Sequence, residues 1–226
     1  MSDRLLTIED IRSLGYDVDE LAPRVFSVNN FLTPEETDLL FAEVKGYSEE
    51  SWSVHWREEL ERNCMRKFGR TDLEQLVAEG LLEISPEFVD RNRGFDNQPF
   101  KEKINKRCQD IFDLLDSGLQ HGGFSAILRQ AEGSELKAHY DQYSDKLIEY
   151  AAILYIHDDY TGGELFFENF DLEFVPRPGS LILFPGTKDY VHGVRFVGPG
   201  PIRYNLPTFI KRSSPDGFMS GWGDFG

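Results

Sequence analysis

The chemistry that this sequence could perform depends on two copies of one short pattern. His139 and Asp141 are separated by a single residue, and so are His157 and Asp159. Residues two apart in an extended strand point to the same face, so an imidazole nitrogen and a carboxylate oxygen can reach one metal ion. A second histidine from a distant strand would complete the facial triad that holds non-haem iron(II). The pattern alone occurs readily by chance, so the surroundings of each copy must decide between them.

Those surroundings differ. His157 follows the apolar run Tyr150–Ile156 and opens the string HDDYTGGE, a dense turn signal that predicts a solvated hairpin turn. His139 ends a strand-like stretch, and enough chain separates it from His192 to wrap round a barrel. His192 lies in the apolar strand-like run YVHGVRFV. On spacing alone, His139 could equally be an exposed loop histidine and His192 an ordinary strand residue.

Arg203 could bind an anion in the same interior. It opens the run IRYNLPTFI, eleven positions beyond His192. A cation that faces a protein interior destabilises the fold by several kcal/mol unless it meets an anion, so a buried Arg203 predicts an acidic ligand. The alternative is a solvated arginine at a strand edge. His55 and His121 have no partner at a comparable spacing, and we assign them no role in the chemistry.

The first half of the chain carries sequence signals for the starts and ends of helices. Thr33 and Glu36 form a capping box ahead of the run DLLFAEVK, and Gly46 stops it, which predicts a helix between them. A weaker capping box, Thr7 with Asp10, predicts a short helix at 8–13. Another, Thr71 with Glu74, predicts a short helix at 72–80. Between 99 and 118, the apolar residues follow the helical period, and they are Phe100, Ile104, Cys108, Ile111 and Leu115. Cys108 is therefore predicted to be a core residue.

After Gly118 the pattern changes to short β-branched and aromatic runs separated by turn residues. About seven strands are expected between 123 and 210, which is typical of a barrel or sandwich. The runs are FSAILRQ, KLIEYAAILYI, GELFF, LEFVP, SLILFP, YVHGVRFV and IRYNLPTFI. The tail from 213 to 226 is too sparse in apolar residues to bury a face, so it is either loose or docked in a groove.

Composition limits the classes of function. The chain of 226 residues carries 24 Lys and Arg against 40 Asp and Glu, a net charge of −16. A field of that sign repels phosphate backbones and anionic lipids, which argues against nucleic-acid and membrane partners. The basic cluster Lys101–Arg107 is interpreted as a solvated helix face. The sequence shows no signal peptide and no membrane-spanning run, so we expect a soluble cytoplasmic protein.

Cysteine usage narrows the metal chemistry. Cys64 and Cys108 form neither a disulfide framework nor a thiolate metal site. Any metal must therefore be held by nitrogen and oxygen.

Read as a block, residues 129–210 resemble the catalytic core of the prolyl 4-hydroxylase group of iron(II)/2-oxoglutarate dioxygenases. The string RQAEGSELKAHYD resembles the lead-in to His-x-Asp, and LYIHDDYTGGELFF resembles the segment that follows it. RPGSLILFPG and VHGVRFVGPGPIRYNL resemble the closing strands, and NNFLTPEETDLLF resembles the preceding helix. The resemblance implies one α+β domain over 1–226, with a double-stranded β-helix core (jelly-roll, cupin-like) flanked by N-terminal helices. Helical support is expected over 1–118, the catalytic core over 119–212 and a flexible tail over 213–226.

The same resemblance assigns roles to residues. His139, Asp141 and His192 would be the iron(II) ligands, Arg203 the partner of the distal carboxylate of 2-oxoglutarate, and Tyr155 a hydroxyl donor to that carboxylate. His157 would lie away from the metal. The implied co-substrates are 2-oxoglutarate and O2, with ascorbate as a reductant. The family's arginine is often ten rather than eleven residues beyond the distal histidine.

Two further departures weaken any inference about the substrate. Gln130 stands where the family has a tyrosine in the lead-in, and Pro207 where it often has a hydrogen-bond donor. We predict a prolyl 4-hydroxylase, like the procollagen-proline 4-dioxygenases, which acts on peptidyl proline and couples 2-oxoglutarate decarboxylation to succinate with C–H hydroxylation. One alternative is a hydroxylase of a free amino acid or other small molecule, and another is a catalytically inactive barrel that serves as a binding module. The acidic and aromatic segment 52–94 is expected to cover the substrate.

Overall fold

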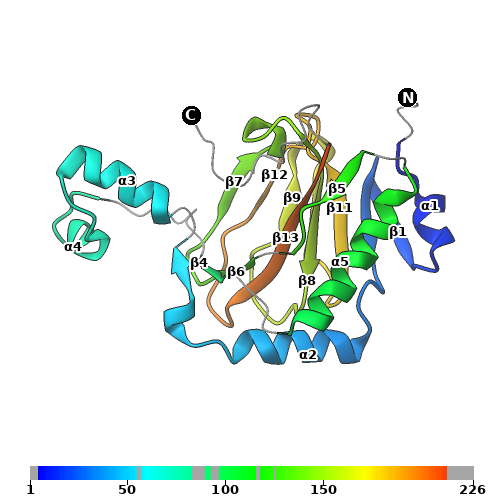
Figure 1. The fold of residues 1–226 in the computed structure, drawn as a ribbon, viewed down its shortest axis with the longest axis horizontal. Coiled ribbons are helices and arrows are strands. Elements are labelled where there is room, and N and C mark those ends of the chain that lie inside the picture. The colour runs from blue at the N-terminus through cyan, green and yellow to red at the C-terminus, as the bar shows by residue number, and fades with distance from the viewer. Residues whose placement is uncertain are drawn as a thin grey trace.

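Two antiparallel β-sheets face each other at the centre of the molecule, and helices pack against the larger sheet (Figure 1). The structure is a computed structural model that describes residues 5–54, 57–82, 90–92, 97–115, 118–124 and 126–212. This arrangement confirms the mixed α and β class, with a β core and flanking helices. In the part of the chain described, no helix combines the length and apolarity needed to cross a membrane.

The larger sheet is built around its two longest strands, β8 and β13, which lie side by side. β8 is an apolar run whose side chains enter two apolar clusters, one shared with the helices and one with the smaller sheet. Across the described residues, the sheet runs β1 (Val18–Ala22), β2 (Val25–Val28), β11 (Leu181–Pro185), β8 (Ile148–Tyr155), β13 (Arg203–Arg212), β6 (Ile127–Gln130), β4 (Asp90–Asn92) and β3 (Ser53–Val54), with β5 (Leu119–His121) paired to β13.

The smaller sheet closes the other side of the barrel. Its order is β10 (Leu172–Phe174), β9 (Leu165–Phe167), β12 (His192–Val194) and β7 (Leu136–His139). Aromatic and aliphatic side chains from both sheets meet in an apolar cluster that includes Tyr155, Phe167 and Phe184. All seven strand runs expected from the sequence are present, and β7 is the strand-like stretch that ends at His139.

Five helices are described: α1 (Ile8–Ser13), α2 (Pro34–Lys45), α3 (Arg57–Phe68), α4 (Leu73–Ala78) and α5 (Gln98–Asp113). The capping boxes at Thr7 and Thr33 are confirmed, because each threonine accepts the backbone N–H three residues on and receives the acidic side chain in return. The box predicted at Thr71 is wrong. The N-cap of α4 is Asp72, whose side chain makes no capping hydrogen bond.

Helix α5 lies across the larger sheet and α2 runs along one end of its strands (Figure 1), and buried residues of both helices pack with that sheet in one apolar cluster. The predicted apolar face of α5 is confirmed, since Phe100, Ile104, Cys108 and Ile111 are all buried. Glu36 joins the two helices through ion pairs to Lys103 and Arg107. The basic cluster on α5 therefore serves partly as an internal contact.

The first 118 residues are less purely helical than predicted. β1 and β2 form a hairpin whose turn places Arg24 in the left-handed region, with φ of 63°. β2 then pairs with β11 and extends the larger sheet. The segment was missed because four residues buried on both faces carry no alternating pattern. The predicted flexible tail, 213–226, lies outside the described residues.

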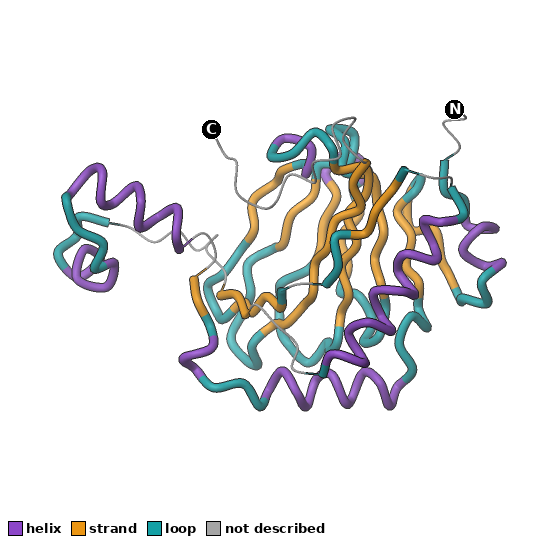
Figure 2. The backbone as a smooth tube through the Cα atoms, in the orientation of Figure 1, coloured by secondary structure: helices purple, strands orange, loops and turns teal. Residues whose placement is uncertain are grey.

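Helices α3 and α4 stand to one side of the sheets (Figure 2). They enclose a small apolar cluster of their own, formed by Cys64, Leu73 and Leu76 with Phe68 and Leu82 packed against it. Cys64 is thus a buried residue of this cluster.

Candidate functional site

The register of the smaller sheet brings His139 and His192 together. His139 is the last residue of β7 and His192 the first of β12, and the two are direct partners in the antiparallel pair. Their ring centroids are 4.5 Å apart. Asp141 begins a short 3-10 turn just beyond β7. The pairing of two strands thus places three side chains at one point, although His192 lies far along the chain.

The three side chains turn their ligand atoms toward one another. His139 Nε2 lies 3.8 Å from Asp141 Oδ1, and His192 Nε2 lies 3.9 Å from Asp141 Oδ2. One ligand atom from each residue lies within 4.8 Å of the others. The Nδ1 atoms donate to the carbonyls of Lys137, at 2.9 Å, and Tyr190, at 3.0 Å. Because a carbonyl only accepts, each Nδ1 carries the proton and each Nε2 keeps its lone pair for a metal.

Burial prepares the same atoms for a cation. Asp141 and His192 are buried, and Asp141 Oδ2 has no hydrogen-bond partner among the described residues. Burial lowers the pKa of His192 to about 4, so its ring is neutral at neutral pH. Burial also raises the pKa of Asp141, and the charge of His139 acts in the opposite direction. Two imidazoles that direct Nε2 toward a buried carboxylate, one of whose oxygens has no hydrogen-bond partner among the described residues, fit iron(II).

A second group of polar side chains surrounds Arg203, which is only 1% exposed. Its Nε donates to the Gly163 carbonyl at 3.1 Å and its Nη2 to the Tyr155 hydroxyl at 3.0 Å. Its Nη1 donates to Gln130 Oε1. All three acceptors are neutral, and within the described residues no ion pair joins Arg203 to a carboxylate. The guanidinium is therefore a buried cation without a counter-ion.

Gly163 allows Arg203 to lie so close to the β8–β9 turn. Its φ is +65°, and a Cβ there would lie 2.9 Å from Arg203 Cδ. Only glycine fits both the backbone conformation and the approach. The Gly-Gly pair was predicted as turn chemistry, and the structure adds this contact with Arg203.

Comparison with known proteins agrees with this geometry. Residues 125–211 match the family model described as the 2OG-Fe(II) oxygenase superfamily, where 2OG denotes 2-oxoglutarate. That span includes the three candidate metal ligands, Tyr155 and Arg203.

Over these residues the chain is similar to 2OG-Fe(II) oxygenases.

Solved structures show the same fold. The viral collagen prolyl hydroxylase of Paramecium bursaria Chlorella virus 1, in its 2OG complex, aligns with a TM-score of 0.57 at 16% identity, covering 84% of this chain and 97% of that one. A truncated form of that enzyme gives a TM-score of 0.55 at 15% identity, covering 84% and 90%. A prolyl-4-hydroxylase from Pseudomonas putida aligns at 0.45 and 18% identity, covering 77% and 100%. No curated protein gives a significant match in sequence. The chain therefore shares the double-stranded β-helix fold of the viral collagen prolyl hydroxylase.

The environment of His157 differs from the sequence prediction. His157 is not in a solvated turn but is 4% exposed, stacked on Phe41 with ring centroids 4.6 Å apart. Its Nε2 accepts the backbone N–H of Tyr204 at 3.0 Å, and its Nδ1 contacts Asp159. The prediction that His157 lies away from the metal is consistent with these partners, since both ring nitrogens are used within the protein.

Other residues were missed or lie elsewhere. Gln130 was noted only as a departure from the family pattern, and Tyr160 was not singled out, yet both lie beside Arg203. The pairing of β6 with β13 is the signal that identifies Gln130, because Gln130 and Arg203 are register partners. His121 packs edge-on against Phe124, away from the three candidate ligands. His55 lies outside the described residues.

Proposed function

We propose that this protein is an iron(II)- and 2-oxoglutarate-dependent dioxygenase in which His139, Asp141 and His192 hold the metal. Arg203 and Tyr155 bind the distal carboxylate of 2-oxoglutarate. The observation that carries the proposal is the buried Arg203, which shares the barrel with the triad and has no carboxylate partner among the described residues. Such a cation is stable only with an anionic ligand.

Each residue has a distinct task in this proposal. The two histidines present Nε2 lone pairs that their Nδ1 hydrogen bonds fix in place. Arg203 offers a rigid, permanently charged fork to a carboxylate, which a lysine could match only as a point charge. The apolar cluster between the sheets excludes water from the reacting groups. With O2 and 2-oxoglutarate, bound iron supplies the oxidation that yields succinate, CO2 and a hydroxylated substrate.

The proposed substrate is a proline within a peptide, as in procollagen-type prolyl hydroxylation. Likeness to a viral collagen prolyl hydroxylase supports this choice. So does Tyr143, which is 82% exposed two residues after Asp141 and packs edge-on against Tyr140. Aromatic rings displayed beside a metal centre offer an apolar face to a proline ring. Ascorbate as the reductant that maintains iron(II) is part of the proposal.

The test is turnover with defined variants. Purified protein with iron(II), 2-oxoglutarate, ascorbate and a proline-rich peptide should release succinate and add one oxygen atom to proline, measured by mass spectrometry. His139→Ala should abolish both signals. Asp158→Ala, an exposed residue of the other His-x-Asp segment, should leave both unchanged. Unchanged turnover in His139→Ala would overturn the metal assignment, and product only on free amino acids would overturn the peptide substrate.

A further inference from the structure

Two buried hydrogen-bond donors beside Arg203 have no acceptor among the described residues. They are the side-chain amide nitrogen of Gln130 and the hydroxyl of Tyr160. The two residues are 2% and 6% exposed, so bulk water does not serve them. Folded proteins rarely leave such donors unpaired, because burial removes their hydrogen bonds to water. Two unpaired donors next to the buried Arg203 indicate that a ligand supplies their hydrogen-bond acceptor.

The orientation of the Gln130 amide follows from its neighbour. A guanidinium has donors only, so the amide must turn Oε1 toward Arg203 Nη1, as it does. The NH2 group is thereby turned away from Arg203. Gln130 on β6 and Arg203 on β13 are direct register partners, so their side chains share one face of the larger sheet. That face looks into the barrel, where Arg203 reaches Tyr155.

The Tyr160 hydroxyl is also committed to donation. Arg203 Cζ lies 5.6 Å from the Tyr160 ring centroid. Burial raises the pKa of Tyr160 to about 12, and the nearby Arg203 charge offsets only part of this effect, so the phenol keeps its proton. Arg203 cannot accept that proton. An acceptor must come from elsewhere.

The group around Arg203 therefore has more donors than acceptors. The three hydrogen bonds of Arg203 use the Gly163 carbonyl, Gln130 Oε1 and the Tyr155 hydroxyl oxygen as acceptors. Tyr155 accepts from Arg203 and so still has its own proton to give. The surplus consists of that proton, the Gln130 NH2, the Tyr160 O–H and the remaining guanidinium N–H groups. A carboxylate supplies a negative charge and about four lone-pair sites, which suits this surplus.

We propose that Gln130 and Tyr160 donate hydrogen bonds to the distal carboxylate of 2-oxoglutarate, alongside Arg203 and Tyr155. The proposal rests on the proposed function, because it names further binding residues for the same co-substrate. It also makes Gln130 a determinant of co-substrate choice. A 2-oxo acid without the second carboxylate leaves the buried donors unpaired and should bind poorly.

Calorimetry on zinc-loaded protein measures this choice without turnover, since Zn(II) is redox-silent. Gln130→Met should weaken 2-oxoglutarate binding about tenfold, the loss of a hydrogen bond to a charged group. The same variant should bind 2-oxobutyrate as the wild type does, because that acid lacks the second carboxylate. Tyr160→Phe should show a smaller loss of the same kind. Gln109→Met, whose amide on α5 bonds to Asp113, is the matched control and should bind both acids normally.

A direct contact is separated from an effect through Arg203 by nuclear magnetic resonance. Adding 2-oxoglutarate to the zinc-loaded protein should shift the side-chain NH2 signal of Gln130 and slow its hydrogen exchange, and 2-oxobutyrate should not. An unmoved signal, or unchanged 2-oxoglutarate affinity in Gln130→Met while the wild type binds it, overturns this inference alone. Failure of the wild type to bind 2-oxoglutarate overturns the proposed function and the inference together.

Discussion

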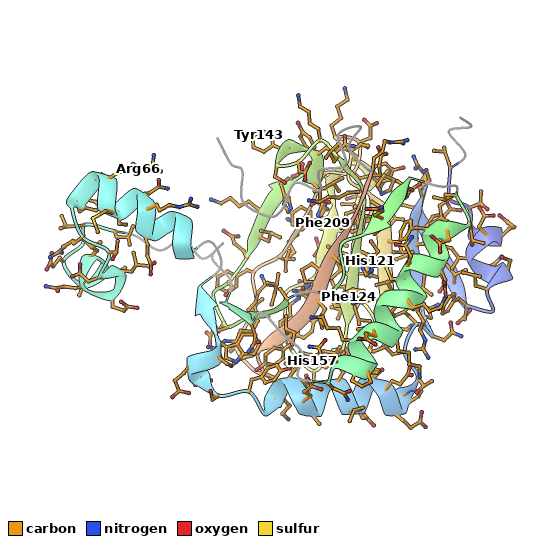
Figure 3. The ribbon with its side chains drawn as sticks, in the orientation of Figure 1. Arg66, His121, Phe124, Tyr143, His157 and Phe209 are labelled. Carbon is orange, nitrogen blue, oxygen red and sulfur yellow. The ribbon has the colours of Figure 1, made fainter. Side chains whose placement is uncertain are left out.

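The two His-x-Asp segments have the same pattern and opposite fates. Tyr143, just after Asp141, and His157 lie at opposite ends of the strands (Figure 3). At the first segment His139 Nε2 faces Oδ1 of the buried Asp141, and the other oxygen of that carboxylate, Oδ2, has no hydrogen-bond partner among the described residues. At the second, Nδ1 contacts Asp159, which is 58% exposed on its side chain, and Nε2 accepts a backbone N–H.

The difference shows what a metal site requires beyond spacing. A ligand nitrogen must be left with its lone pair, and a carboxylate must be buried without a hydrogen-bond donor that satisfies it. His139 achieves the first because its Nδ1 is held by a carbonyl. His157 fails because the protein itself uses both ring nitrogens. The same His-x-Asp spacing therefore gives a candidate metal site at one place and a structural contact at the other.

The largest expected contrast is in metal affinity. Asp141→Asn removes a buried anionic ligand and should weaken Mn(II) binding about 100-fold or more. Asp159→Asn alters an exposed carboxylate and should leave the affinity within about twofold. Titration followed by electron paramagnetic resonance measures both. Equal losses in the two variants would contradict the distinction between the segments.

For the free energy of unfolding, we expect substitution in the His157 segment to have a larger effect than substitution in the His139 segment. His157→Phe keeps the stacking on Phe41 but leaves the Tyr204 N–H without its acceptor, so the free energy of unfolding should fall by about 2 kcal/mol. His139→Phe changes a side chain that is 37% exposed, and in metal-free protein it should cost less than about 1 kcal/mol. Urea denaturation with a chelator present gives both values. A larger loss in His139→Phe would show that the first segment also supports the fold.

The smallest expected effect is on pH dependence. Burial lowers the pKa of His157 below its ordinary value of 6.5, and the bond to Asp159 opposes this only in part. His157 therefore binds a proton more readily in the unfolded chain than in the folded protein. Its contribution to the free energy of unfolding is full above about pH 6.5 and declines as the pH falls toward the pKa of His157 in the folded protein. Between pH 7.5 and 5.5, His157→Phe should lose less stability than the wild type, by under about 1 kcal/mol.

Urea denaturation at several pH values measures this difference. His121 and His192 also have lowered pKa values and contribute equally to both proteins, so the comparison isolates His157. Identical pH profiles for the two proteins would contradict the lowered pKa of His157.

Much of the site was predictable from local strings. Spacing alone left His139 and His192 open, but the ordered motifs between 129 and 210 resembled a known family, and that resemblance assigned the triad and the role of Arg203. The β7–β12 register agrees with this triad. The environment of His157 was not predictable. Its burial depends on Phe41 in α2 and Tyr204 in β13, residues far from it in sequence. The contact of Gln130 with Arg203 was not predictable for the same reason, since it depends on the pairing of β6 with β13.

By itself the sequence determined which residues were able to perform chemistry and where many of the helices and strands lie, because side-chain type and periodicity are local properties. Tertiary structure alone decided which atoms remain available. Whether a ring nitrogen meets a carbonyl, a carboxylate or an N–H depends on strands that are distant in the chain and adjacent in the sheet. Burial likewise arises only when the two sheets pack together. It raises the pKa of Asp141, and it removes from water an Arg203 that has no counter-ion among the described residues.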